Sequence, residues 1–185
     1  MKNYLIVFVM IGILSSCSTD NADEDMIEFV QGEVIVGIKS GTDINRVFDF
    51  INQFDHKVKN IRSLTFTSDL PSDSLQYVIR TLNEKTYTND GINWFVTGYL
   101  HYQTNQITIF PKLFDMDNVD FQNDWLISME EFDLKTKHYN NLNAGIIHFY
   151  VPKGSELEWE NRFKNSDIVE WAELNYIQEI THGIN

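Results

Sequence analysis

Histidine, serine and acidic residues are the side chains of this sequence that could do metal, nucleophilic or acid-base chemistry. The histidines are scattered with no spacing typical of metal ligands: His56, His101, His138, His148 and His182. There is no HExxH or cysteine-based zinc pattern, and no GxSxG motif that would present a nucleophilic serine. The acidic run from Asp115 to Asp120 lacks ligand and glycine positions that an EF-hand loop requires. We therefore expect no catalytic residue, no metal site, no cofactor and no enzyme activity.

Cys17 is the one cysteine, and its place in the chain indicates a different kind of chemistry. It follows Leu14-Ser15-Ser16, and an aliphatic residue, two small residues and a cysteine are typical of a lipobox. Lys2 and the apolar run over residues 5–14 have the charge and length of a signal-peptide core, and the run is short for a membrane-spanning helix. We expect residues 1–16 to be a lipoprotein signal peptide and Cys17 to carry the lipid. The alternative is an ordinary signal peptide with a chance cysteine.

Residues 17–31 are expected to form a tether between the lipid and the folded domain. They begin with a polar stretch that contains Asp20, Asp23, Glu24 and Asp25 and no large aliphatic side chain, so it should stay solvated. An acidic run behind a lipidated cysteine resembles a signal for export to the cell surface. We expect a protein anchored by its N-terminal lipid in the bacterial envelope, in the outer membrane, either periplasmic or exposed on the surface.

The charge of the chain argues against a nucleic-acid partner. The sequence has 14 basic and 27 acidic residues, a net charge of -13, and removal of residues 1–16 takes away only Lys2, which makes it -14. Such a field repels a phosphate backbone. The remaining residues 32–185 are enough for one domain with a sizeable core.

The first half of this domain has a strand-helix-strand pattern. Residues 33–38 are a β-branched run, which indicates a strand. Apolar residues then recur at helical spacing from Ile44 to Phe54, behind a cap at Thr42 or Asp43. We expect a second strand over residues 58–66, although its alternation is interrupted.

The last part of the chain repeats this pattern. A strand over residues 145–151 stops at Pro152, a capping box of Ser155 and Glu158 should open a helix that runs through Phe163, and residues 169–177 should form the last strand. The two halves together predict an α+β fold of the ferredoxin-like, split βαβ type, with an antiparallel sheet and both helices on one face.

An insertion at about residues 68–143 separates the two halves. It is much longer than an ordinary connection, so we expect it to form an α+β subdomain of its own. A helix is predicted around residues 75–82, a hairpin from residues 94–102 and 106–110, and another helix around residues 121–132. Its aromatic side chains are too many to leave in water.

Two segments at the ends of the domain are Glu33-Val34-Ile35-Val36-Gly37-Ile38-Lys39 and Trp171-Ala172-Glu173-Leu174-Asn175-Tyr176. Together they resemble the N-terminal prodomain of subtilisin-like serine proteases and the related stand-alone I9-type inhibitors. Leu174 replaces the proline that the family usually has, and the long insertion is foreign to the simple prodomain. Because no protease domain follows before Asn185, we expect that this chain is not the prodomain of its own enzyme.

The resemblance implies a non-catalytic protein that inhibits or docks a subtilisin-like protease. In that family the open face of the sheet contacts the protease, and the chain after the last strand enters the active-site cleft as an extended segment. The residues of this sequence that match those positions are Glu173, Asn175, Tyr176, Ile177, Thr181, His182 and Gly183.

A second hypothesis uses the insertion instead of the last strand. The aromatic side chains Trp94, Tyr99, Tyr102, Trp125 and Trp171 could stack on sugars, although aromatic residues at strand and helix spacing usually belong to a core. The alternative function is therefore a surface lipoprotein that binds glycan or another envelope protein. An exposed row of these aromatic residues would favour this alternative.

Overall fold

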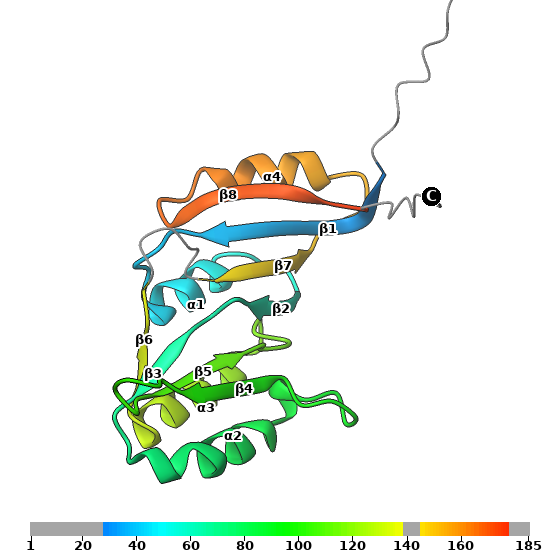
Figure 1. Cartoon of the computed structure of the whole chain (residues 1–185). Helices are drawn as coiled ribbons and strands as arrows, with labels where there is room; N and C mark the ends of the chain where they lie inside the picture. The colour runs from blue at the N-terminus through cyan, green and yellow to red at the C-terminus, as the bar shows by residue number, and fades with distance from the viewer. Residues whose placement is uncertain (1–27, 139–144, 178–185) are drawn as a thin grey trace, which may run out of the picture.

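The computed structural model describes residues 28–138 and 145–177, which form an α+β fold with two antiparallel sheets (Figure 1). The first sheet has the order β2-β7-β1-β8 and consists of β1 (Phe29–Ile38), β2 (Val58–Arg62), β7 (Ile146–Tyr150) and β8 (Val169–Tyr176). The second has the order β4-β5-β3-β6 and consists of β3 (Phe66–Ser68), β4 (Val96–Leu100), β5 (Ile107–Pro111) and β6 (Leu134–Thr136). The described helices are α1 (Ile44–Asn52), α2 (Leu75–Asn83), α3 (Val119–Glu131) and α4 (Glu156–Lys164), with 3-10 turns η1 (Ser72–Ser74) and η2 (Thr86–Thr88). The predicted α+β class is confirmed.

Strand β1 begins before the expected start of the domain at Gly32. Phe29 pairs with Tyr176 of β8, and the backbone N–H of Ile177 donates to the carbonyl of Glu28 over 2.8 Å. Phe29 and its two successors, assigned to the tether from their sequence, are therefore part of the sheet. The first residue of β1 and the last residue of β8 lie side by side at one end of the first sheet (Figure 1).

The single strand predicted over residues 58–66 is wrong, because the chain breaks there and passes from one sheet to the other. Strand β2 ends at Arg62, and β3 begins at Phe66 in the second sheet. Between them Ser63 has a φ of 61°, a left-handed conformation that does not continue a strand. The hydrophobic pattern does not predict this boundary, because the boundary depends on the backbone conformation of one residue.

The two helices of the first sheet start in different ways. Of the two caps expected for α1, Thr42 or Asp43, the structure has Asp43, whose side chain accepts a hydrogen bond from the backbone N–H of Asn45 over 2.8 Å. The capping box predicted for α4 is wrong, because the side chain of Ser155 caps no backbone N–H. The neighbouring Glu156 instead accepts from the backbone N–H groups of Gly32, over 2.7 Å, and Gly154, over 2.8 Å. Helix α4 is thus fastened to β1 by a long-range contact that no local pattern could predict.

The segment between the two halves contains the elements expected from its sequence. Helix α2 follows Pro71, β4 and β5 form the predicted hairpin, and α3 covers most of the last predicted helix. The hairpin is shorter than expected, because β4 begins at Val96 and ends before Tyr102. Strand β3 belongs to this second sheet as well, so the second sheet begins at Phe66.

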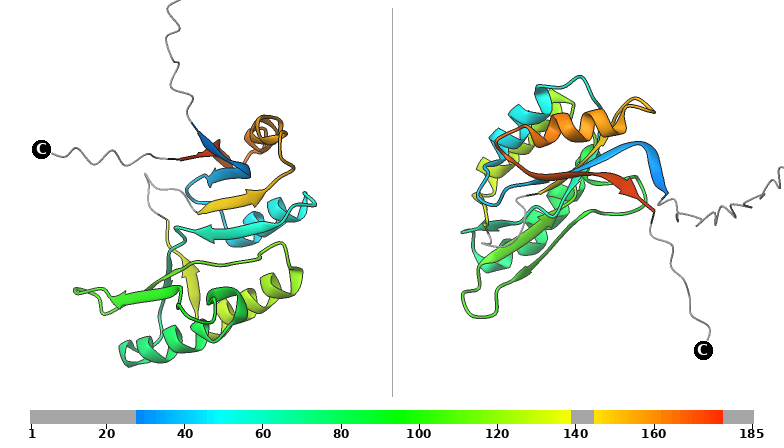
Figure 2. Two further views of the ribbon diagram at one scale, coloured as in Figure 1. Left: turned by 90° about the vertical axis from the view of Figure 1, so that its right-hand side faces the viewer. Right: turned by 90° about the horizontal axis from the view of Figure 1, so that it is seen from above.

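One pair of residues joins the two sheets. Ile61 of β2 and Leu113, just after β5, exchange backbone hydrogen bonds of 2.7 and 2.9 Å. Both side chains are fully buried and belong to one hydrophobic core that includes residues of both sheets. The chain from β2 to β3 therefore runs through the middle of the molecule, between the first sheet and the β4–β5 hairpin (Figures 1 and 2).

Helices α1 and α4 lie on one face of the first sheet. Phe50 of α1 and Phe163 of α4 meet Phe149 of β7, with ring centroids 5.9 and 4.5 Å apart, respectively. Helix α1 also contacts helix α3. The side-chain amides of Asn52 in α1 and Gln122 in α3 exchange hydrogen bonds of 2.9 and 2.8 Å. The opposite face of the first sheet carries no helix of the described residues.

Candidate functional site

The helix-free face of the first sheet is the best candidate for a functional site. Its residues alternate with the core residues of β1, β7 and β8, and cross-strand register brings them into rows, such as Ile35 opposite both His148 and Glu173. We call this surface the open sheet face, and it comprises Glu33, Ile35, Gly37, Lys59, Asn60, Arg62, Ile146, His148, Tyr150, Trp171, Glu173 and Asn175. Charged and polar side chains predominate on it, unlike the apolar face beneath the helices.

A buried carboxylate organises one end of the open sheet face. Glu33 is only 5% exposed, and its two oxygens accept hydrogen bonds from Lys59, over 2.5 Å, and from the side chain of Asn175, over 2.6 Å. The hydrogen bond to Glu33 raises the pKa of Lys59 above its usual value. The ammonium group of Lys59 also lies 5.7 Å from the ring centre of Tyr150. This network joins three strands through side chains on the solvent side of the sheet.

His148 and Asn60 face each other across β7 and β2 in the middle of the open sheet face. Both ring nitrogens of His148 and the side-chain oxygen of Asn60 are shielded from solvent and have no hydrogen-bond partner in the described structure. Burial lowers the pKa of His148 to about 4, and the positive charges of Arg62, Lys59 and Lys112 act in the same direction. The imidazole is therefore neutral at pH 7.

Trp171 lies flat against β1 because Gly37 leaves room for it. A Cβ atom at Gly37 would come within 2.2 Å of the indole ring. The two residues are cross-strand partners, and the ring is only partly buried. The glycine thus positions a large aromatic surface on the open sheet face.

The structure places four of the residues expected to bind a partner. Glu173 and Asn175 lie on the open sheet face, and Tyr176 and Ile177 follow at the end of β8, where they are 47% and 46% exposed. Thr181, His182 and Gly183 lie outside the described residues, as does Cys17. The sequence did not single out Glu33, Lys59, Arg62 or His148 as site residues. The polar Glu33 within the apolar run of β1 was the one local signal.

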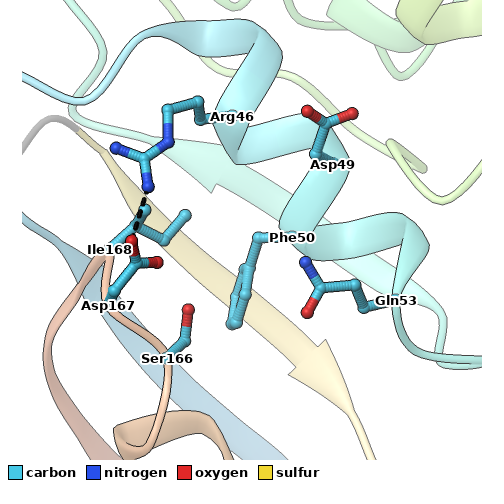
Figure 3. Close-up of a pocket in the computed structure, with 7 residues that line it drawn as sticks. All are labelled: Arg46, Asp49, Phe50, Gln53, Ser166, Asp167 and Ile168. Atoms are coloured by element: carbon cyan, nitrogen blue, oxygen red, sulfur yellow. Dashed lines mark hydrogen bonds and ion pairs between the residues drawn. The ribbon is translucent and has the colours of Figure 1, made fainter.

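A small surface cavity of about 180 Å³ lies between α1 and the loop that connects α4 to β8 (Figure 3). Arg46 and Asp167 form an ion pair of 2.7 Å at its edge, and their side chains are 56% and 80% exposed. Such an exposed pair contributes little stability. The described residues that line this cavity include neither a histidine nor a cysteine.

The aromatic residues named for sugar stacking have different environments. Trp125 is fully buried and belongs to the core, and Trp171 lies on the first sheet. Trp94, Tyr99 and Tyr102, by contrast, are 63%, 43% and 84% exposed at or near the β4 edge of the second sheet. Tyr99 also stacks on Phe110 with ring centroids 5.8 Å apart. Three of the five aromatic residues are therefore exposed at or near the second sheet, whereas Trp171 is partly buried on the open sheet face.

The described residues have neither a cluster of metal ligands nor a helix that could span a membrane. Within residues 28–138 and 145–177, no three His, Cys, Asp or Glu side chains are grouped so that they could hold a metal ion. The same residues contain no helix with the length and apolar character that crossing a bilayer requires.

Removal of either partner of Glu33 should destabilise the fold. We expect Lys59→Ala or Asn175→Ala to lower the free energy of unfolding by about 1 to 3 kcal/mol, because a buried carboxylate loses a hydrogen bond. Urea unfolding followed by circular dichroism measures the change. Lys57→Ala is the matched control, since Lys57 is exposed and has no ion pair in the described structure. Equal stabilities of the Lys59 and Lys57 variants would contradict the role of Glu33.

His148 should make stability depend on pH between its two pKa values. The pKa of His148 is about 4 in the folded chain, below the usual 6.5 of a solvated histidine, so the unfolded chain takes up the proton first as pH falls. The free energy of unfolding should decrease by up to about 3 kcal/mol from pH 6.5 to pH 4, relative to a His148→Gln variant that lacks this group. If the free energies of unfolding of the two proteins change with pH in parallel over this range, the pKa of His148 is not lowered by folding.

No family model matches this chain, and no match was found among curated proteins or among solved structures. Membership of a family is therefore not shown, and the resemblance to subtilisin prodomains stays a prediction from the residues at the two ends of the domain.

Proposed function

We propose that this chain is a non-catalytic binding protein of the bacterial envelope, whose first sheet docks a subtilisin-like serine protease as an inhibitor or a docking subunit. The observation that carries the proposal is the open sheet face, which adjoins the point where the chain leaves β8 at Ile177. A partner that covered this face would meet the residues after Ile177 at the same edge.

The strand order supports a ferredoxin-like arrangement of the first sheet. In the order β2-β7-β1-β8, each strand is antiparallel to its neighbours, α1 follows β1 and α4 follows β7. Two split βαβ units give this order, with the second sheet as an insertion between them. A ferredoxin-like first sheet and docking through the open sheet face would both agree with the resemblance of the chain ends to subtilisin prodomains.

The end of β8 is suited to present an extended segment. The Phe29 pairing and the hydrogen bond from Ile177 to Glu28 hold the strand against β1 up to its last residues. Tyr176 and Ile177 leave about half of their surface exposed. An extended chain that enters a protease cleft gains backbone hydrogen bonds there, and side-chain pockets give specificity.

The proposed location follows from the residues before the domain. Cys17 would hold the protein on the envelope membrane through its lipid, and the acidic residues behind it would keep the domain away from the bilayer surface. Both the lipid and the surface location are proposals from the sequence.

Glycan binding is a second candidate, which the exposed aromatic residues favour. Trp94, Tyr99 and Tyr102 lie at or near the β4 edge of the second sheet, and the stack of Tyr99 on Phe110 provides a flat surface. Aromatic faces of this kind can pack on sugar rings. This candidate uses the second sheet and leaves the open sheet face free.

The protease proposal is tested with the chain from Asn21 against a panel of subtilisin-class proteases. We expect inhibition, and we expect truncation after Ile177 to weaken it about tenfold or more, because the extended segment is lost while the Ile177 to Glu28 hydrogen bond is kept. Inhibition constants measure the effect.

Charge reversal on β8 supplies a matched pair of variants for the same assay. Glu173→Arg changes the open sheet face, whereas Glu170→Arg changes an exposed residue at the register shift of β8, outside that face. Only the first should weaken inhibition. No inhibition by the full domain, together with its rapid degradation, would reject the protease as the partner.

The glycan proposal predicts binding on a glycan array that depends on the second sheet. Trp94→Ala and Tyr102→Ala should each reduce binding about tenfold, because stacking area is removed. Tyr77→Ala is the control, since Tyr77 is 52% exposed but lies on α2. An array without a bound glycan, or an equal loss in the control variant, would reject this candidate.

A further inference from the structure

Two positive side chains face each other at the junction of the two sheets. Ile61 and Leu113 pair in antiparallel register, so the next residue along places Arg62 opposite Lys112. Ile61 and Leu113 point into the core, and their neighbours therefore lie on the opposite, helix-free side. Like charges directly opposite each other destabilise a sheet. We call Arg62 and Lys112 the cationic pair.

The cationic pair forms no ion pair among the described residues, although the charge of Glu33 acts on the same His148 in the opposite direction. Within the part of the chain that the structure describes, neither Arg62 nor Lys112 forms an ion pair with a carboxylate, whereas Lys59 forms one with Glu33. Lys112 lies against two rings instead, 5.3 Å from the centre of Phe95 and 4.9 Å from that of Phe114. Two cations without an ion pair are unusual in a chain with a net charge of -13, because acidic residues outnumber basic ones.

Unpaired polar atoms adjoin the cationic pair. Asn60 is 4% exposed, and its side-chain oxygen has no hydrogen-bond partner, as is true of both ring nitrogens of the opposite His148. Arg62 and Lys112 are close enough to His148 to depress its pKa. A buried polar group without a partner costs free energy, so the surroundings of Asn60 are incomplete in the isolated chain.

An acidic peptide would complete these surroundings. Its carboxylate would neutralise the cationic pair, and its apolar atoms could lie on Phe95 and Phe114. The oxygen of Asn60 is shielded from solvent, so a peptide N–H can donate to it only after a covering side chain moves. Arg62 is exposed and can move aside without breaking an ion pair of the described residues. A nucleic acid fits less well, because the net charge of the chain repels a continuous phosphate backbone.

We propose that Arg62, Lys112, Asn60 and His148 form a binding site for an acidic peptide segment of a partner protein, with an aspartate or glutamate carboxylate between the two cations. The proposal rests on the use of the open sheet face for docking, and it does not require that the partner be a protease. It names the chemistry of the partner at the junction of the two sheets.

The test uses the full mature chain in detergent micelles and a peptide of about ten residues with one central glutamate among uncharged residues, called the glutamate peptide, which spans about 33 Å as a strand. A glutamine peptide of equal length and inorganic phosphate are the other probes. NMR follows the side-chain signals of His148 and Asn60 during each titration. We expect saturable binding of the glutamate peptide alone and a rise in the pKa of His148 on binding, because a carboxylate comes close to it.

Variants locate the site. Arg62→Glu should weaken peptide binding at least tenfold, and Lys112→Gln tests the same pair with a milder change in case the first variant does not fold. Arg80→Glu, an equal charge change at an exposed position of α2, should leave binding within about twofold. An equal loss in the Arg80 variant would overturn the site, because the effect would then come from net charge.

Three other outcomes separate this proposal from the proposed function. Absence of saturable binding, or equal binding of phosphate or the glutamine peptide, overturns the acidic-peptide site. Peptide binding that depends on Arg62 without inhibition of any protease supports the site and rejects only the protease as the partner. Protease inhibition that is unchanged in Arg62→Glu, without peptide binding, supports docking and rejects this site.

Discussion

Two backbone hydrogen bonds between Ile61 and Leu113 join the two sheets of this protein, which also share one hydrophobic core. They set the register in which the second sheet continues from β2. Because both side chains are buried, this register also decides that Arg62 and Lys112 lie on the helix-free side. A shift by one residue would turn these charged side chains into the core and expose the apolar ones.

The alternation of side chains along β1 gives the first sheet two different surfaces. One side buries Val34 and Val36 against α1 and α4, whereas the other holds Glu33 in a network with Lys59 and Asn175. A carboxylate that is 5% exposed needs such partners, because desolvation of an unpaired charge is expensive. The open sheet face is therefore ordered by polar contacts before any partner binds, which reduces the entropy that docking would cost.

The two halves of the first sheet were predictable because their patterns are local. A β-branched run followed by apolar residues at helical spacing indicated β1 and α1, and the sequence narrowed the cap of α1 to Thr42 or Asp43. The break at Ser63 was not, because it depends on a backbone angle and on pairing with a distant strand. The start of α4 was predicted for the wrong reason, since Glu156 binds Gly32 across the fold and the Ser155 side chain caps nothing.

The sequence by itself determined the negative net charge and the alternating patterns from which the α+β class follows. The envelope signal around Cys17 is a prediction from the sequence. Only the tertiary structure decided which polar residues meet. His148 and Asn60 are far apart in the chain and adjacent across two strands, and Trp94 and Trp125 have equal side chains but opposite exposure. The physical reason is that periodicity reports the local conformation of a segment, whereas burial and charge pairing depend on the register between segments that are distant in sequence.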